Sequence, residues 1–368
     1  MHRQRIGFAC KWLNSTTESR DKKIRAEERS LNTSSTTVAW LNRQRRSEAE
    51  DRLWYVAKHN IQSVKNVLDR VAQLDPHLHM MRLSSDLLPV YTEATWRYFW
   101  QQPDVRDWCE QQFAEIGELA RMHGIRLSFH PGQFCVLASE NDDVVRRSIE
   151  EFEYHASMAR WMGYGRSWHD EGFKINVHIS GRRGPQGIVD VLGRLTPEAR
   201  NLITIENDEM SWSLDDGLVL APHVALVLDI HHHLLHSGGE YIEPTDDRWK
   251  LVVGSWRGVR PVIHYSVSRH DLMPTHALDV RPDVSSLIET GTIGKTKLRA
   301  HSDDVWNTAC NAWALSFWPD ADIMTETKWK NLAAGRLLDQ ATGRINISVR
   351  QGTDYATGVD KREKEQAS

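Results

Sequence analysis

The sequence of 368 residues predicts a single (β/α)8 barrel, the TIM-barrel fold of the α/β class. Three observations lead to this prediction. Eight short apolar segments recur along the chain, helical patterns fill the intervals, and a histidine or an acidic residue stands where most segments end. Strands that alternate with helices form parallel sheets, and eight such units can close into a barrel. A doubly wound open sheet is the weaker alternative.

The expected strands are short and rich in branched apolar residues, as buried parallel strands are. In chain order they are Ile6–Cys10, His79–Leu83, Ile125–His130, Lys174–Ser180, Leu202–Glu206, Val224–Asp229, Pro261–Ser266 and Ala321–Glu326. Helical periodicity marks Val56 to Val71 and Phe113 to Ala120. A further helix is expected to begin near Asp142, with that residue as its N-cap.

We expect one barrel domain over residues 1–332. Residues 14–51 are polar and charge-dense, and they predict an insertion between the first strand and the first helix. Residues 333–368 form a C-terminal extension that we expect to be partly disordered, because its end is polar.

Composition narrows the class of protein. The chain is 40% hydrophobic and 26% charged, which is typical of a globular protein with a large core. No apolar run approaches the roughly 18 residues that span a bilayer, and the segment after Arg3 and Arg5 is too short for a signal peptide. We therefore expect a soluble, cytoplasmic protein, with a nuclear or mitochondrial location open for a eukaryotic source.

Net charge and cysteine content narrow the class of protein further. The four cysteines lie far apart without a CxxC pair, which excludes a disulfide framework and a thiolate zinc site. The net charge of −4 argues mildly against a nucleic-acid binder. A local positive groove or bound metal ions can still supply the attraction.

Candidate metal ligands occupy the strand ends. They are His130, His178, Glu206, Asp229, His264 and Glu326. The carboxyl ends of barrel strands meet at one mouth, so these side chains are expected to converge. Imidazole and carboxylate groups are ligands for zinc, manganese or iron, and divalent cations would relieve the repulsion among the carboxylates. The pattern predicts a metal centre.

A histidine triplet follows the sixth strand, in the run Asp229-Ile230-His231-His232-His233. On an extended chain Asp229, His231 and His233 would share a face. If a turn begins after Asp229, His232 points inward instead. His276 lies in a later loop, where it is either a ligand or a solvated side chain.

Two further strand-end runs carry polar groups, Arg82 to Asp86 and His130 to Phe134. Their serines, glutamine and backbone amides could hold phosphate oxygens, although a capped polar turn would look the same. No Walker loop or GxGxxG motif appears, so no nucleotide cofactor is expected. A GxSxG motif is also absent, which argues against a covalent serine nucleophile.

Four strings together resemble the UV damage endonuclease family, which is related in fold to the type IV AP endonucleases. They are Met81–Asp86 (MRLSSD), Leu127–Phe134 (LSFHPGQF), Glu206–Glu209 (ENDE) and Asp229–His233 (DIHHH). The resemblance covers roughly residues 5 to 330 in unbroken order. It implies a TIM barrel with three divalent metal ions, typically manganese, with zinc, magnesium or cobalt as alternatives. The implied activity is a nick immediately 5′ to cyclobutane dimers and 6-4 photoproducts, which leaves a 3′-hydroxyl and a 5′-phosphate.

The resemblance also implies roles for single residues. His130, His178 and Glu206 would hold one metal; Glu206, Asp229, His264 and Glu326 a second; His232 and His276 the third. Glu206, Asp229, His232 and Glu326 would be catalytic, and Gln133, Phe134, Phe8, Arg82, Ser84, Ser85 and Asn207 would contact DNA or the lesion. The chain departs from some relatives at Val262, where they have lysine, and at Phe8, where they have tyrosine.

The expected partner is double-stranded DNA carrying UV photoproducts, and the expected state is a monomer. Gln133 and Phe134 are placed to enter the gap left by flipped bases, although Phe134 could instead pack beneath its own loop. Two rival interpretations remain. One is a metal-dependent sugar isomerase or epimerase on the same barrel, and the other is a non-catalytic protein that binds damaged DNA.

Overall fold

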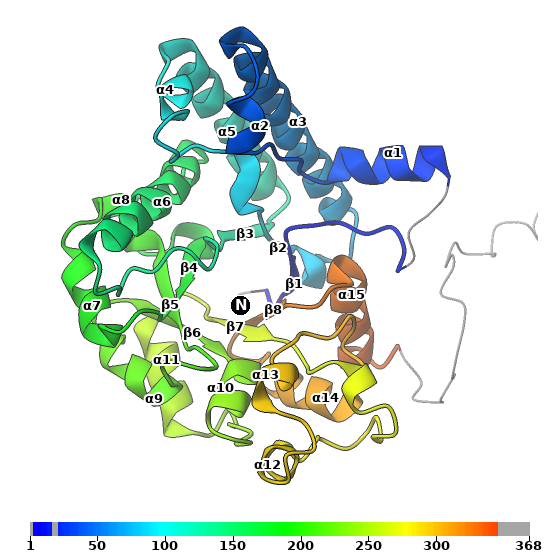
Figure 1. Ribbon diagram of the computed structural model, residues 1–368. Coiled ribbons are helices and arrows are strands. Elements are labelled where there is room, and N and C mark those ends of the chain that lie inside the picture. The colour runs from blue at the N-terminus through cyan, green and yellow to red at the C-terminus, as the bar shows by residue number, and fades with distance from the viewer. Residues whose placement is uncertain (1–2, 17–20, 345–368) are drawn as a thin grey trace, which may run out of the picture.

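The computed structural model describes residues 3–16 and 21–344. Eight parallel strands close into a barrel in the order β1 to β8, with β8 paired to β1, which confirms the predicted fold (Figure 1). The strands are β1 (Ile6–Ala9), β2 (Met80–Arg82), β3 (Arg126–Phe129), β4 (Lys174–His178), β5 (Ile203–Glu206), β6 (Ala225–Asp229), β7 (Val262–Tyr265) and β8 (Asp322–Thr325). Each lies within its predicted segment.

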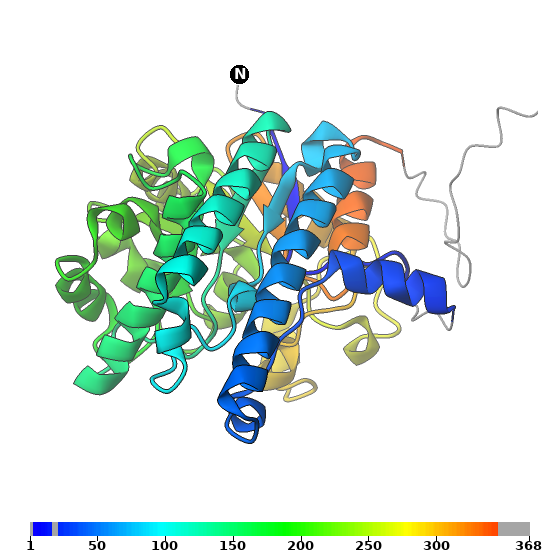
Figure 2. The ribbon, with the colours of Figure 1, turned by 90° about the horizontal axis from the view of Figure 1, so that it is seen from above.

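Helices surround this barrel and bury one face against it (Figure 2). They are α1 (Lys22–Leu31), α2 (Val38–Leu41), α3 (Arg46–Ala72), α4 (Arg97–Trp100), α5 (Pro103–Met122), α6 (Asp142–Trp161), α7 (Gly184–Leu192), α8 (Pro197–Leu202), α9 (Leu214–Gly217), α10 (Ile230–His236), α11 (Asp247–Ser255), α12 (Val284–Glu289), α13 (Lys295–Leu298), α14 (Thr308–Ser316) and α15 (Lys330–Ala341). Figure 1 looks onto the carboxyl ends of the strands, and in Figure 2 the blue chain that enters β1 comes from the opposite side. The mouth of the barrel therefore faces the viewer in Figure 1.

The predicted insertion at 14–51 contains helical structure. It includes α1 and α2, and its end is the first part of α3, which begins at Arg46 and continues for 27 residues. Asn32 fixes the loop to the barrel, because its side chain accepts from the Trp12 amide at 2.9 Å and donates to the Trp12 carbonyl at 2.9 Å.

Two expected boundaries differ from the structure. The N-cap of α6 is Asn141 rather than Asp142, because the Asn141 side chain accepts from the amides of Asp143 and Val144. The expected end of the barrel domain at residue 332 falls within α15. That helix buries Ala333 and Leu337, among others, against the barrel. Residues 345–368, the rest of the expected C-terminal extension, lie outside the described residues.

An arginine cluster closes the amino-terminal end of the barrel. Asp322, the first residue of β8, is fully buried, and its carboxylate lies 2.9 Å from Arg126 and 2.7 Å from Arg260. The same carboxylate accepts the Arg5 amide at 2.9 Å. The remaining guanidinium donors of Arg126 bond to the carbonyls of neighbouring loops. A buried carboxylate needs such partners, because its desolvation is otherwise costly.

The remaining expectations about the chain concern membranes and thiols. None of the helices in the described ranges has the length and apolarity required to cross a membrane. All four cysteines are free, and three of them are buried, in agreement with the absence of a disulfide framework.

Candidate metal centre

The six strand-end residues converge at the mouth. His178, Glu206 and Asp229 are the last residues of β4, β5 and β6, and the sheet register pairs His178 with Glu206 and Asp229 with His264. His130 follows β3 by one residue, and Glu326 follows β8 by one residue. The positions that were expected to meet do meet, because parallel strands in register end at the same edge.

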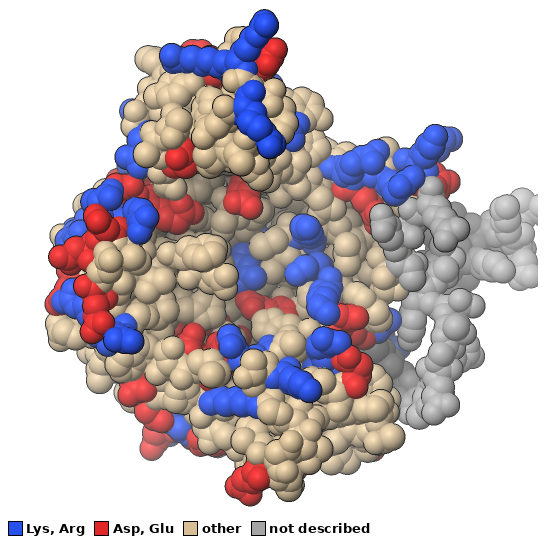
Figure 3. Space-filling model, in the orientation of Figure 1, with Lys and Arg blue, Asp and Glu red and all other residues tan. Residues whose placement is uncertain are grey.

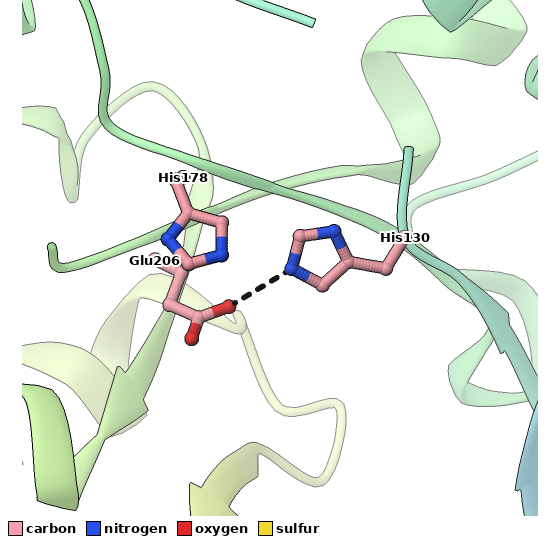
Figure 4. A group of neighbouring side chains, drawn as sticks. All are labelled: His130, His178 and Glu206. Atoms are coloured by element: carbon pink, nitrogen blue, oxygen red, sulfur yellow. Dashed lines mark ion pairs between the residues drawn. The ribbon is translucent and has the colours of Figure 1, made fainter. Parts of the chain in front are cut away.

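Glu206 is the centre of the cluster, and it is fully buried. Its Oε2 atom lies 3.5 Å from Nε2 of His130, as Figure 4 shows, and 3.1 Å from Nδ1 of His264. Its Oε1 atom lies 3.4 Å from Nδ1 of His232. His178 points into the same space, with its ring centroid 5.0 Å from that of His130. One carboxylate therefore faces imidazoles from four sides of the mouth.

Three groups have the spacing of metal ligands. They are His130 with His178 and Glu206, Glu206 with Asp229 and His264, and His178 with Glu209 and His232; within each group the ligand atoms all lie within 4.8 Å of one another. Glu206 belongs to two of these groups. Glu326 joins the cluster through His264, whose Nδ1 is 3.2 Å from its Oε1.

Unpartnered atoms show that this donor set fits divalent metal ions. Within the described residues, Glu206 Oε1, Asp229 Oδ2 and His264 Nδ1 are buried and have no hydrogen-bond partner. All three residues belong to one group. Buried polar atoms are normally satisfied, since an unsatisfied one costs about 1–3 kcal/mol. Carboxylate oxygens and an imidazole nitrogen aimed at one point are what a divalent ion satisfies.

Burial and neighbouring charges shift the pKa values of these side chains. Burial and the neighbouring carboxylates hold the pKa of Asp229 well above its usual range, even though His232 acts in the opposite direction. For Glu206, burial raises the pKa, but His264 and His178 bring it well below the ordinary value. Burial lowers the pKa of His264 to about 4, so this imidazole is neutral and able to act as a ligand.

A helix that begins within the histidine triplet's run decides which of the three side chains faces the cluster. Strand β6 ends at Asp229 and α10 begins at Ile230, so the two-residue alternation of a strand does not continue. The Asp229 side chain caps this helix by accepting the His232 amide at 2.8 Å. His232 consequently faces the cluster, whereas His231 lies between Ser266 and Ser268, at 3.0 and 3.1 Å.

His276 does not join the cluster in this structure. Its Nδ1 lies 2.8 Å from its neighbour's carbonyl at Ala277, and its ring lies 6.2 Å from that of Trp306. The side chains beside His232 are instead Glu209, with Oε2 at 3.7 Å from Nε2, and His301, whose ring centroid is at 6.3 Å. The pair expected for the third metal is thus not assembled here.

The loop after β3 presents an exposed aromatic side chain. Phe134 is 86% exposed, and Gln133 is exposed beside it. The turn is held by Cys135, whose amide donates to the Gly132 carbonyl at 2.9 Å, and by Ser85, whose hydroxyl donates to the His130 carbonyl at 2.7 Å. Phe134 therefore does not pack beneath its own loop.

Four of the side chains expected to contact DNA have partners within the protein. Phe8 is 1% exposed and its ring lies 6.0 Å from that of Trp12, which corrects its expected contact with DNA: the side chain points into the core. Asn207 is buried and exchanges hydrogen bonds with the Asp229 backbone at 2.9 and 3.0 Å. Ser84 accepts the Asp86 amide at 3.4 Å, and Arg82 forms an ion pair with Glu326.

Sequence reasoning missed the support beneath the cluster. Lys174 is 1% exposed with Nζ 3.0 Å from Nε2 of His264, and Asn176 donates to Glu206 while accepting from Thr204 at 2.7 Å. Both belong to β4, Lys174 four and Asn176 two residues before His178, so the alternation of side chains along the strand could have revealed them. Glu209 carried no such signal, because it lies in a loop.

The strand ends of this TIM barrel bring together histidines and carboxylates whose spacing could hold a metal ion, as in metal-dependent enzymes of this fold class. The chain belongs to the UV-endonuclease UvdE family, whose family model matches residues 4–355.

Single relatives agree with this assignment. The chain is 29% identical over 308 residues to a UV-damage endonuclease of Schizosaccharomyces pombe, covering 78% of this chain and 46% of that protein. It is 25% identical over 332 residues to a UV DNA damage endonuclease of Bacillus pumilus, covering 87% of this chain and 92% of that protein. The solved structure of SacUVDE has a similar fold, with a TM-score of 0.67 at 21% identity, covering 93% of this chain and 100% of that one. The chain thus spans less than half of the S. pombe relative.

Proposed function

We propose that this protein is a metal-dependent DNA repair endonuclease that nicks the phosphodiester bond immediately 5′ to UV photolesions. Its membership of the UvdE family supports a damaged-DNA substrate. The observation that carries the proposal is the set of buried ligand atoms on Glu206, Asp229 and His264 that lack a hydrogen-bond partner among the described residues. These atoms suit metal-assisted hydrolysis, and nothing in their chemistry requires an organic cofactor.

We propose that the site binds three divalent metal ions and that manganese is the preferred metal. His130, His178 and Glu206 would hold one, and Glu206, Asp229, His264 and Glu326 a second. His232 would serve the third. When bound, such ions supply Lewis acidity for phosphodiester hydrolysis. The chain's own residues hold the ligands in place: Asn176 donates to Glu206, and Lys174 contacts His264.

The proposed substrate is double-stranded DNA with cyclobutane dimers or 6-4 photoproducts, and the proposed products carry a 3′-hydroxyl and a 5′-phosphate. Photolesions weaken stacking, which lowers the few kcal/mol needed to extrude nucleotides. Phe134 could stack into the resulting gap, because its ring is exposed on a loop anchored next to His130. We propose that the protein acts as a monomer.

A nicking assay tests the proposed activity. Supercoiled plasmid, irradiated or undamaged, is incubated with the protein and Mn²⁺, with and without chelator, and the ends of the nick are mapped. We expect nicks only with metal and mainly on irradiated DNA. A protein that binds irradiated DNA without cutting it would be a non-catalytic binder, and one that converts sugars but ignores DNA would be an isomerase. Either result would overturn the proposal.

The lesion probe is tested separately. The double variant Gln133→Ala/Phe134→Ala is expected to keep its metals and its melting temperature but lose the preference for irradiated plasmid. Met122→Ala is the matched control, since Met122 is 75% exposed and ends α5 on the outside of the barrel. An unchanged ratio of nicking on irradiated to undamaged plasmid in the double variant would exclude the probe role.

A further inference from the structure

Three basic side chains meet at the mouth beside Glu326. Arg82 ends β2, Lys11 follows the end of β1 by two residues, and Lys330 is the first residue of α15. Strand β1 lies between β8 and β2 in the barrel, so the turns that carry these residues are neighbours. Figure 3 shows basic side chains along the hollow on the side of β1 and α15, with acidic side chains in its floor. Lys11, Arg82 and Lys330 are called the basic cluster below.

The charges of the basic cluster are only partly neutralised. Arg82 pairs with Glu326, yet its buried Nε has no hydrogen-bond partner among the described residues. Within the same described ranges, the ammonium groups of Lys11 and Lys330 form no ion pair. Burial lowers the pKa of Lys330; Cys10 and Glu326 raise it, while Arg82 and Lys11 lower it, so its ammonium lies among these groups. An anion would relieve the repulsion among the three cations.

The backbone holds this arrangement at a cost. Lys330 has a φ of 48° and Cys10, next to Lys11, has a φ of 69°. Residues other than glycine rarely adopt this left-handed conformation, which costs on the order of 1–3 kcal/mol and often occurs at functional sites. The Cys10 amide donates to the Arg82 carbonyl at 2.8 Å, which ties the turn that carries Lys11 to Arg82.

The start of α15 adds further donors. This helix of 12 residues has no side-chain N-cap and no acidic residue in its first turn, so the positive end of its dipole is not neutralised. Thr327, in the turn before the helix, is 2% exposed, and its hydroxyl has no hydrogen-bond partner among the described residues. In this turn the Lys330 amide donates to the Thr327 carbonyl at 3.4 Å and the Leu332 amide to the Trp329 carbonyl at 2.9 Å. The Asn331 amide has no backbone partner among the described residues. Helix N-termini commonly bind phosphate through such amides.

We propose that the basic cluster, together with Thr327 and the first turn of α15, binds a backbone phosphate of the DNA strand next to the scissile bond. The inference rests on the proposed function, since it takes DNA as the ligand. Arg82 links the two sites, because its guanidinium pairs with Glu326 of the metal cluster. The cluster would hold the strand in register without reading its sequence.

Salt dependence of binding tests this site. The dissociation constant of the full chain for a short fluorescent duplex is measured by anisotropy at several salt concentrations in chelator, so that cleavage does not interfere. Each phosphate contact contributes about 0.9 to the slope of log Kd against log salt concentration. Lys330→Gln is expected to weaken binding about fivefold at low salt and to lower the slope by about 0.9, equally for irradiated and undamaged duplex. Lys330→Arg should keep the slope.

Lys250→Gln is the matched control, because Lys250 is exposed on α11 and, within the described part of the chain, its one ion pair is with Asp247. It should leave both affinity and slope unchanged. A slope for Lys330→Gln equal to that of the unchanged protein would overturn the phosphate site, and so would an equal loss in Lys330→Arg. This outcome is separate from the proposed function, which fails only if the metal-loaded protein does not nick irradiated plasmid.

Discussion

Glu206 shows how much one side chain depends on its neighbours. It ends a strand, is fully buried, and faces His130, His232 and His264 at 3.1–3.5 Å. Asn176 holds one of its oxygens by donating a hydrogen bond. The other oxygen has no hydrogen-bond partner among the described residues, which suits the proposed bridging of two ions.

We expect Glu206→Gln to lose metal binding and nicking. The amide keeps the size of the side chain but removes the charge that would offset two dications. The measurements are metal content by elemental analysis and the rise in melting temperature on adding Mn²⁺. A ligand present at 100 times its Kd raises the free energy of unfolding by about 2.7 kcal/mol. Glu118→Gln, on the exposed side of α5, is the control. Full metal content in Glu206→Gln would contradict the bridging role.

Substitutions of His232 and His231 should affect different properties of the protein. His232→Ala is expected to lose metal and rate, because its ring faces Glu206, Glu209 and Asp229. His231→Ala should instead lose stability, since both ring nitrogens contact serine hydroxyls on the fold. Metal content and urea unfolding of the two variants separate these effects. If His231→Ala loses the more metal, the assignment of His232 is wrong.

At the scale of elements, the helices determine where the strand ends lie. Helices α5 and α6 flank β3, which carries His130 at its end. They approach closely at Gly117, where an added Cβ would lie 2.0 Å from the Met162 carbonyl oxygen. That oxygen is backbone and cannot move aside easily.

Gly117→Ala is therefore expected to destabilise the protein by about 3 kcal/mol through overpacking. Gly335→Ala is its counterpart, because Gly335 lies within α15 and an added Cβ meets no atom within 4 Å. This change should stabilise the protein by up to about 1 kcal/mol, since alanine favours helices. Urea unfolding measures both. Equal effects of the two substitutions would show that the close approach of α5 and α6 is not a constraint.

At the scale of the whole molecule, the two ends of the barrel differ: the candidate site lies at one end, and a buried ion-pair cluster closes the other. The mouth carries the histidines and carboxylates of the candidate metal centre, and the opposite end is closed by the contacts of Asp322 with Arg126 and Arg260. His169 lies near that closed end, 1% exposed, with Nδ1 3.2 Å from the Phe173 carbonyl. Burial lowers its pKa to about 3.

This histidine predicts acid sensitivity. The folded protein holds His169 neutral, whereas the unfolded chain binds a proton below the ordinary pKa of 6.5, so stability is lost as the pH falls below that value. Between pH 7 and pH 5 this one group should cost about 2 kcal/mol. Asparagine tolerates the left-handed φ of 45° at this position. Between pH 7 and pH 5 the free energy of unfolding of His169→Asn should therefore fall by about 2 kcal/mol less than that of the unchanged protein. Urea unfolding of the metal-free proteins at both pH values is the measurement, and an unchanged pH dependence in the variant would refute the explanation.

The chain by itself determined the barrel, the positions of its strands and the residues at their ends. Strand length and apolar content depend on local sequence, and the convergence of strand ends follows from parallel topology alone. Only the tertiary structure showed that Phe8 is buried, that His276 lies apart from the cluster, and that Glu209 lies beside His232. The physical reason is that a loop's path and a side chain's exposure depend on packing between segments distant in sequence. The same holds for the basic cluster, whose members come from three separate turns and meet only when β1 closes the barrel between β8 and β2.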